Sequence, residues 1–142
     1  MKRLLAGIVL CAAAYGVVVA GDTVTQRALS SAKMVQIEQN LINAFESGIP
    51  GLQTSAAITM IQVQKEVPGY RWSNSIIPLM RVVNGEDNDA NARTMAALAL
   101  SQLRSDCGDY SIVRNARFTS NPRVRRYCTL LAANRLAEKE AP

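Results

Sequence analysis

The chain has 142 residues and a mass of 15.4 kDa, which suits one domain of ordinary size and is too short for two. It is 49% hydrophobic and only 5% aromatic, which excludes a disordered chain and favours closely packed helices over a β-sandwich. Histidine is absent, so the usual zinc ligand, the usual general base and every histidine-dependent catalytic triad are excluded.

The N-terminus has the pattern of a secretory signal. Lys2 and Arg3 precede an uncharged apolar run over residues 4–20, which ends in Val-Val-Ala, the small residues that a signal peptidase requires. We therefore expect residues 1–20 to be removed and the protein to reach the periplasm or the extracellular space. The run is also long enough for a retained anchor that leaves the protein facing the periplasm, and this alternative stays open. Loss of Lys2 and Arg3 lowers the net charge from +5 to +3, a small excess that disfavours nucleic acid as a partner.

After an N-terminal extension at residues 21–33, apolar residues recur at the spacing of helices, and no segment alternates with the period of a strand. Glycine and proline separate the helical segments. Asp89 stands where it would cap the fourth helix, and Asn121-Pro122 opens the last. The six helices expected lie near residues 34–45, 52–67, 76–83, 92–103, 111–118 and 122–137.

The starts of the second, fourth and sixth helices superpose without gaps, which indicates an internal repeat. Each start carries a small residue four positions after an apolar one, namely Ala56, Ala96 and Cys128. Their separations of 40 and 32 residues fall within the range of stacked helical hairpins. Because small residues allow helices to approach to about 8–10 Å, we expect all three to be buried.

These segments resemble HEAT and armadillo-like repeats. In that family the second helix begins near an Asp or Pro, passes a Val-Arg pair and continues into an Ala-Ala-x-Ala-Leu stretch. Residues 89–93 with 96–100 match best and residues 121–125 come next, whereas the first repeat has Gln53 in place of the arginine. Residues 76–80 resemble the first helix of a hairpin, which often carries a proline.

The resemblance covers residues 34–137 and implies an all-α fold, a short right-handed α-solenoid of about three antiparallel hairpins. A charged tail would follow at residues 138–142. An irregular helical bundle is the alternative architecture.

The resemblance also implies binding to proteins along the second helix of each hairpin. It points to Gln53, Arg93, Arg125 and Arg126 as contact residues, although the family's repeat arginine commonly pairs with an acidic residue of a neighbouring repeat and is then structural. Residues 114–126 contain five arginines and no acid, so Arg114 and Arg117 extend a basic surface suited to an acidic protein, anionic lipid or acidic glycan.

Two short segments each allow two interpretations. Residues 70–72 (Tyr-Arg-Trp) are either a binding hot spot or, as we favour, a filler between hairpins. Residues 87–91 resemble the start of a calcium loop, but Ala92 replaces the glycine and Leu98 replaces the bidentate glutamate. We therefore expect turn and capping chemistry there, and no metal site.

Cys107 and Cys128 are the cysteines outside the signal. An even pair in an exported chain suggests a disulfide. A regular stack of hairpins would instead separate the two by about 16 Å along the helix axis, too far for a bond. Both a Cys107–Cys128 bond and two separate buried thiols remain open.

No phosphate-binding loop, nucleophile elbow or carboxylate pair is present, so we expect neither catalysis nor a cofactor. The sequence favours an exported helical-repeat protein that acts as a scaffold or protein-protein interaction module in the cell envelope. The alternative is a membrane-associated helical protein, anchored by residues 4–20, whose basic face touches anionic lipid or glycan.

Overall fold

The computed structural model describes residues 31–140, so the signal predicted at residues 1–20 lies outside the described part. The chain divides after Met34, and the features below belong to the compact unit that starts at Val35. Within residues 31–140 there are six α-helices and no strand, which confirms the all-α prediction. The helices are α2 (Ser31–Glu46), α3 (Pro50–Glu66), α4 (Ile76–Asn84), α5 (Ala90–Leu103), α6 (Asp106–Phe118) and α7 (Pro122–Glu140).

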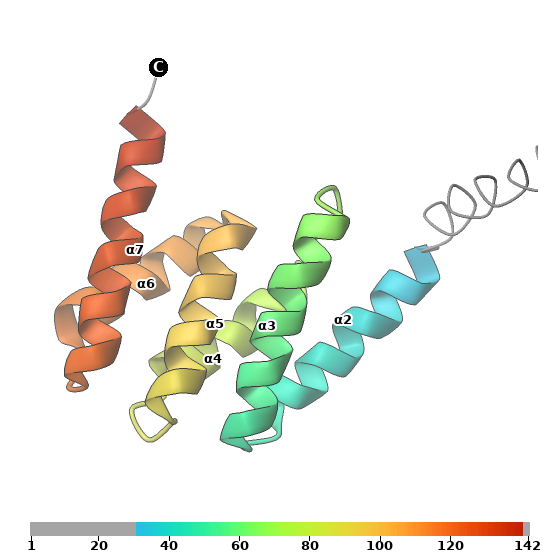
Figure 1. The fold of residues 1–142 in the computed structure, drawn as a ribbon, viewed down its shortest axis with the longest axis horizontal. Helices are drawn as coiled ribbons and strands as arrows, with labels where there is room; N and C mark the ends of the chain where they lie inside the picture. Colours follow the sequence, from blue (N-terminus) through green and yellow to red (C-terminus); the bar gives the residue numbers. More distant parts are fainter. Residues whose placement is uncertain (1–30, 141–142) are drawn as a thin grey trace, which may run out of the picture. The chain divides into compact units, whose positions relative to one another are not determined.

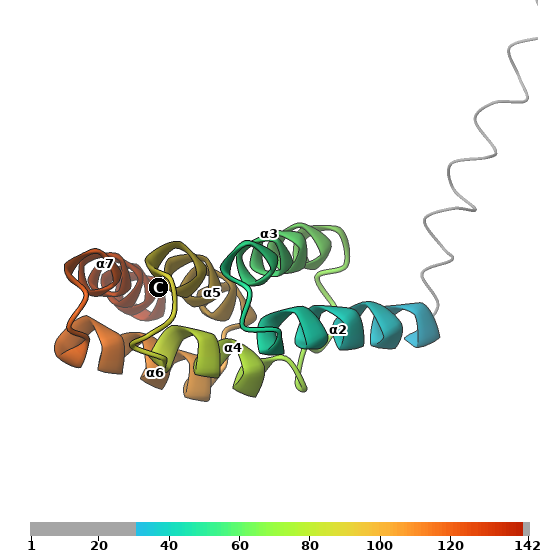
Figure 2. The ribbon, with the colours of Figure 1, turned by 90° about the horizontal axis from the view of Figure 1, so that it is seen from below.

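The helices alternate between two layers (Figures 1 and 2). One layer holds α3, α5 and α7, with α5 packed against both of the others. The other layer holds α2, α4 and α6, and α4 packs against α6. Each helix of the second layer is followed in the chain by a helix of the first, so the sequence runs through three successive helical pairs.

Small side chains lie buried on the helices of the first layer. Ala56 is 5% exposed, and Ala96 and Cys128 are fully buried, as the repeat predicts. Leu79 and Val83 of α4 are also fully buried. The first layer thus buries alanine-sized residues at these positions, together with larger side chains such as Met60 and Leu100.

Side-chain caps fix the starts of two helices at the predicted residues. The Asp89 carboxylate accepts hydrogen bonds from the backbone N–H of Asn91 and Ala92, at 2.8 and 3.2 Å, and α5 begins at the next residue. Asn121 caps α7 in the same way, and Pro122 occupies the first helical position, where its missing N–H costs no helical bond.

Two helices are longer than their apolar pattern predicts. Helix α6 begins at Asp106 and not near residue 111, because Ser105 caps it by accepting a bond from the Gly108 N–H at 3.1 Å. Asp106 and Asp109 in its first turn favour the positive end of the helix. Helix α7 continues to Glu140, so most of the expected charged tail is helical. Polar turns carry no apolar periodicity, which is why the pattern misses them.

The aromatic pair before α4 fills space inside the fold. Trp72 is 3% exposed and packs edge-on against Tyr70, with the ring centroids 4.9 Å apart. Its indole N–H donates to the Gln64 side chain. Arg71 between them is exposed. This supports the filler interpretation of residues 70–72.

Cys107 and Cys128 are both free in the structure, so the possible disulfide is not formed. The early start of α6 places Cys107 in its exposed first turn, whereas Cys128 occupies the buried small-residue position of α7. Of the two thiols expected to be buried, only that of Cys128 is buried. This burial raises the pKa of the Cys128 thiol to about 11.

Candidate functional site

The equivalent positions 53, 93 and 125 serve the fold itself. In each helical pair the side chain at this position donates a hydrogen bond to a backbone carbonyl in, or just after, the last turn of the preceding helix. The three bonds are Gln53 Nε2 to Phe45 O (2.8 Å), Arg93 Nε to Val83 O (2.9 Å) and Arg125 Nε to Thr119 O (3.1 Å). Such carbonyls lack partners within their own helix, so one bond per pair satisfies a helix end.

Gln53 and Arg93 were therefore wrongly predicted as partner contacts, since they are 4% and 0% exposed. Arg93 serves the fold, because its Nη2 donates to Glu86 at 2.8 Å, an acid of its own helical pair and not of a neighbouring one as the resemblance implied. It also reaches the next pair at Asn115 and Thr119 of the α6 region, at 3.0 and 2.9 Å. Sequence reasoning failed here because a polar residue's burial depends on where the neighbouring helix ends.

The other predicted arginines lie on the last helical pair and face solvent. Arg114 and Arg117 are on α6, and Arg126 is on α7. Within residues 31–140 none of these three has a hydrogen bond or ion pair to another side chain. Arg125 is exposed as well, but its guanidinium is held by the Thr119 carbonyl. Three of the predicted contact residues are thus free to meet a partner.

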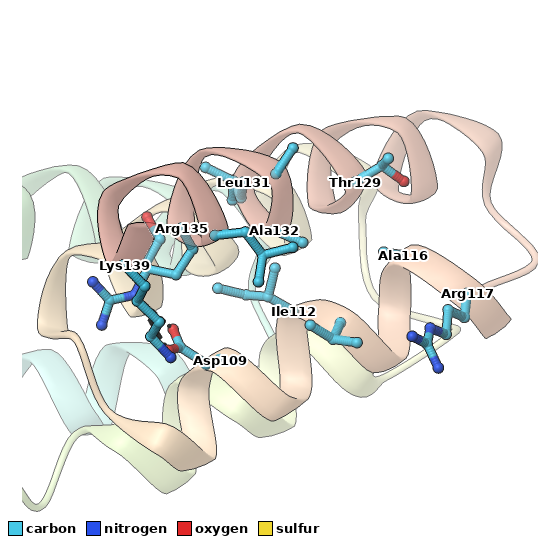
Figure 3. A pocket seen from close by; sticks show the side chains of 13 residues that line it. Asp109, Ile112, Ala116, Arg117, Thr129, Leu131, Ala132, Arg135 and Lys139 are labelled. Atoms are coloured by element: carbon cyan, nitrogen blue, oxygen red, sulfur yellow. Dashed lines mark hydrogen bonds and ion pairs between the residues drawn. The ribbon is translucent and has the colours of Figure 1, made fainter. Parts of the chain in front are cut away.

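An open groove of about 530 Å³ runs between α6 and α7 beside Arg117 (Figure 3). Its apolar lining comes from both helices and consists of Ile112, Val113, Ala116, Leu131, Ala132, Ala133 and Leu136. Figure 3 shows Ile112 between the two helices, with Arg117 at one end of the groove. Asp109, Arg135 and Lys139 lie together at the other end.

The ion pairs at that second end leave an excess of positive charge. Asp109 accepts from Arg135 at 3.1 Å and from Lys139 at 3.5 Å. Glu138 pairs with Arg135 at 3.1 Å and with Arg104 at 3.5 Å. The three cations Arg104, Arg135 and Lys139 therefore share two carboxylates. Each carboxylate already has two basic partners.

The face of α7 beside the groove is open, whereas the equivalent face of α5 is covered by other helices. Arg93, Ala97 and Leu100 share the side of α5 from which Arg93 reaches α6, and all three are fully buried. Their counterparts on α7 are Arg125, Thr129 and Ala132, of which the first two are exposed and the third is half-buried. The groove lining beside these positions is largely apolar.

The groove was missed by the predictions from sequence, because the exposure of Ala132 and Leu136 on α7 is set by which helices pack beside them.

Among residues 31–140 no group of three or more acidic, cysteine or histidine side chains could hold a metal ion. None of the helices in that range combines the length and the apolar character needed to span a bilayer. A scan against protein-family models, a search of curated proteins and a search of solved structures each find no match to this chain.

Proposed function

We propose that this chain is an exported, non-catalytic helical-repeat protein that binds a partner protein in the cell envelope through the groove between α6 and α7. In this proposal the three helical pairs form a short right-handed α-solenoid of HEAT-like repeats. The proposal draws support from the alternating layers, the burial of Ala56, Ala96 and Cys128, and the carbonyl bond repeated in each pair. Export rests on the sequence pattern of residues 1–20.

One observation carries the proposed binding site. The α7 flank at Thr129 and Ala132 is open, although the same flank of α5 is buried beneath the next helical pair. Contiguous exposed apolar surface of this kind often marks an interaction site. An apolar flank rimmed by basic side chains has the character of an interface core with a polar rim.

Co-purification of the tagged full-length protein tests this proposal. Ala132→Arg would place a long cationic side chain in the groove, and we expect it to release a partner that the unaltered protein retains in stoichiometric amount. Ala137→Arg makes the same change at an exposed position of α7 outside the groove and should retain the partner. Thr129→Arg, at an exposed groove position, repeats the test if Ala132→Arg unfolds the protein by circular dichroism. Retention of the partner by both groove variants would refute the proposed site.

The exposed, unpaired Arg114, Arg117 and Arg126 favour a second candidate function, which is membrane association. In that case residues 4–20 would stay as an anchor and the basic face would touch anionic lipid or glycan. Fractionation separates the two candidates. Release by osmotic shock supports the exported interaction protein, and retention in membranes after a high-salt wash supports the anchored protein.

A further inference from the structure

The shape of the groove suits a helix. Ala116 and Thr129 are small side chains at one part of its lining, and Ala132 and Ala133 are small side chains further along α7. Small contact residues allow helix axes to approach to about 8–10 Å. The chain itself provides the precedent, since the matching flank of α5 is covered by helices α6 and α7. A helix is therefore the element that this surface is built to receive.

The charges at the ends of the groove select an acidic occupant. At one end Arg117 has no carboxylate partner within the described chain. At the other end Arg135 and Lys139 are both paired with Asp109. With Arg104 and Glu138 they form a cluster of three cations and two carboxylates, which has one excess positive charge. Asp109 is the sole carboxylate among the groove-lining residues of the described part. Both ends thus attract negative charge, while the middle excludes it.

The groove's length sets the size of the occupant. From Thr129 to Lys139 along α7 the rise is about 15 Å, and from Asp109 to Arg117 along α6 it is about 12 Å. A helix covering this span uses about two to three turns. Its apolar residues would recur at positions i, i+3, i+4 and i+7 so as to form one stripe.

We propose that the groove binds one amphipathic α-helix of a partner protein, whose short apolar stripe carries an acidic residue at each end. This rests on the proposed function and specifies the partner of the same site. A protein helix fits better than an anionic bilayer, because the small residues Ala116 and Ala132 lie between the two helices where a flat surface does not reach. One acidic end would meet Arg117 and the other would meet Arg135 and Lys139.

The probe for this proposal is a labelled synthetic helix of about 18 residues, long enough to be helical in water. It has leucine at the stripe positions and two glutamates at each end, and a matched peptide has lysine in place of every glutamate. Fluorescence anisotropy with the full chain should give a Kd for the acidic peptide that is lower by about tenfold or more than that of the basic peptide. Arg117→Glu should weaken the acidic peptide about fivefold or more, because it reverses the charge at one end.

Matched controls separate the groove from general charge effects. Arg71→Glu makes the same charge change at an exposed arginine outside the groove and should leave the Kd unchanged. Ala132→Arg should abolish peptide binding and Ala137→Arg should preserve it. Equal binding of the acidic and basic peptides, or binding that survives Ala132→Arg, would overturn the proposal.

Other results would assign the groove to a different occupant and would equally overturn it. One is binding to phosphatidylcholine–phosphatidylserine vesicles that Arg117→Glu abolishes, with no binding of the peptide. Another is a dimer in sedimentation that Ala132→Arg dissociates. If neither peptide binds but Ala132→Arg still releases the co-purified partner, the inferred chemistry is wrong and the proposed function stands. If Ala132→Arg releases nothing, the proposed function itself fails.

Discussion

Two junctions between successive helical pairs each depend on one glutamate, but the two carboxylates lie in opposite surroundings. Glu38 of α2 is 2% exposed and accepts bonds from the backbone N–H and hydroxyl of Ser75, which precedes α4, each at 3.1 Å. Glu86, in the connection between α4 and α5, is exposed and accepts bonds from the N–H and hydroxyl of Ser120, just before α7. In both cases a carboxylate of one pair secures the loop that leads into a later helix.

The remaining partners make the junctions chemically different. Glu38 accepts a bond from the neutral Tyr70 hydroxyl at 2.7 Å, so the first junction buries an acid among uncharged donors. Glu86 accepts from Arg93, so the second junction buries a base and leaves the acid in contact with water. The pKa of the Tyr70 phenol is raised at the first junction, whereas the pKa of the Glu86 carboxyl is lowered at the second.

The largest effect should come from Arg93→Ala, which deletes the buried cation of the second junction. The change removes the donor to Val83 O and the bonds to Glu86, Asn115 and Thr119, and it leaves a cavity. We expect the free energy of unfolding to fall by about 3–4 kcal/mol, measured by urea denaturation.

Arg125→Ala is the matched control at the equivalent position of the last pair. Its side chain is exposed and bonds only to the Thr119 carbonyl, so the loss should stay below about 1 kcal/mol. Equal losses for the two variants would show that burial of Arg93 contributes nothing to the second junction.

A somewhat smaller effect is expected at the first junction. Glu38→Ala removes the acceptor of the Asn74 N–H and of the Ser75 and Tyr70 hydroxyls, at a cost of about 2–3 kcal/mol. The Ser75 N–H keeps its bond to the Trp72 carbonyl. Glu38→Gln keeps one acceptor oxygen and should recover part of this loss in the same urea measurement. If Gln and Ala cost the same, hydrogen bonding at Glu38 is not what holds this junction.

Local chemistry allowed much of the fold to be predicted from the sequence. The caps at Asp89 and Asn121 and the buried positions of Ala56 and Ala96 depend on neighbours within a few residues or on helical spacing. The start of α6 was missed because Ser105 and its polar first turn carry no apolar signal.

The candidate site was less predictable because it depends on tertiary contacts. Arg93 and Arg125 occupy equivalent positions in the repeat, yet one is buried and the other exposed. What separates them is which helices pack beside them, because α6 and α7 pack against α5, and no local pattern records this. The groove depends on tertiary packing in the same way, since the exposure of Ala132 is set by the helices beside α7.

Acid should weaken the second junction. Bonds from Arg93 first, and then from Ser120 and Thr119, lower the pKa of Glu86 from 4.5 to about 2. Because the folded state favours the carboxylate, the junction's contribution is complete above the unfolded pKa of 4.5 and is lost as the pH falls from there to about 2. The difference in unfolding free energy between wild type and Glu86→Gln, measured in urea, should therefore shrink over this range. A difference that stays constant would remove Glu86 from the acid response.

Alkali should produce the smallest effect, and at the other junction. Burial first, and then the bond to Glu38 and its negative charge, raise the pKa of Tyr70 from 10.0 to about 12. Here the folded state favours the protonated phenol, so the contribution is complete below pH 10 and is lost as the pH rises from 10 to about 12. Tyr70 is partly exposed, so water screens the effect and a modest loss is expected. Tyr70→Phe should remove this part of the alkaline loss and leave the acid response of Glu86 intact. If Tyr70→Phe instead altered the acid response, the two junctions would be coupled through α4 and α5 and would not titrate independently.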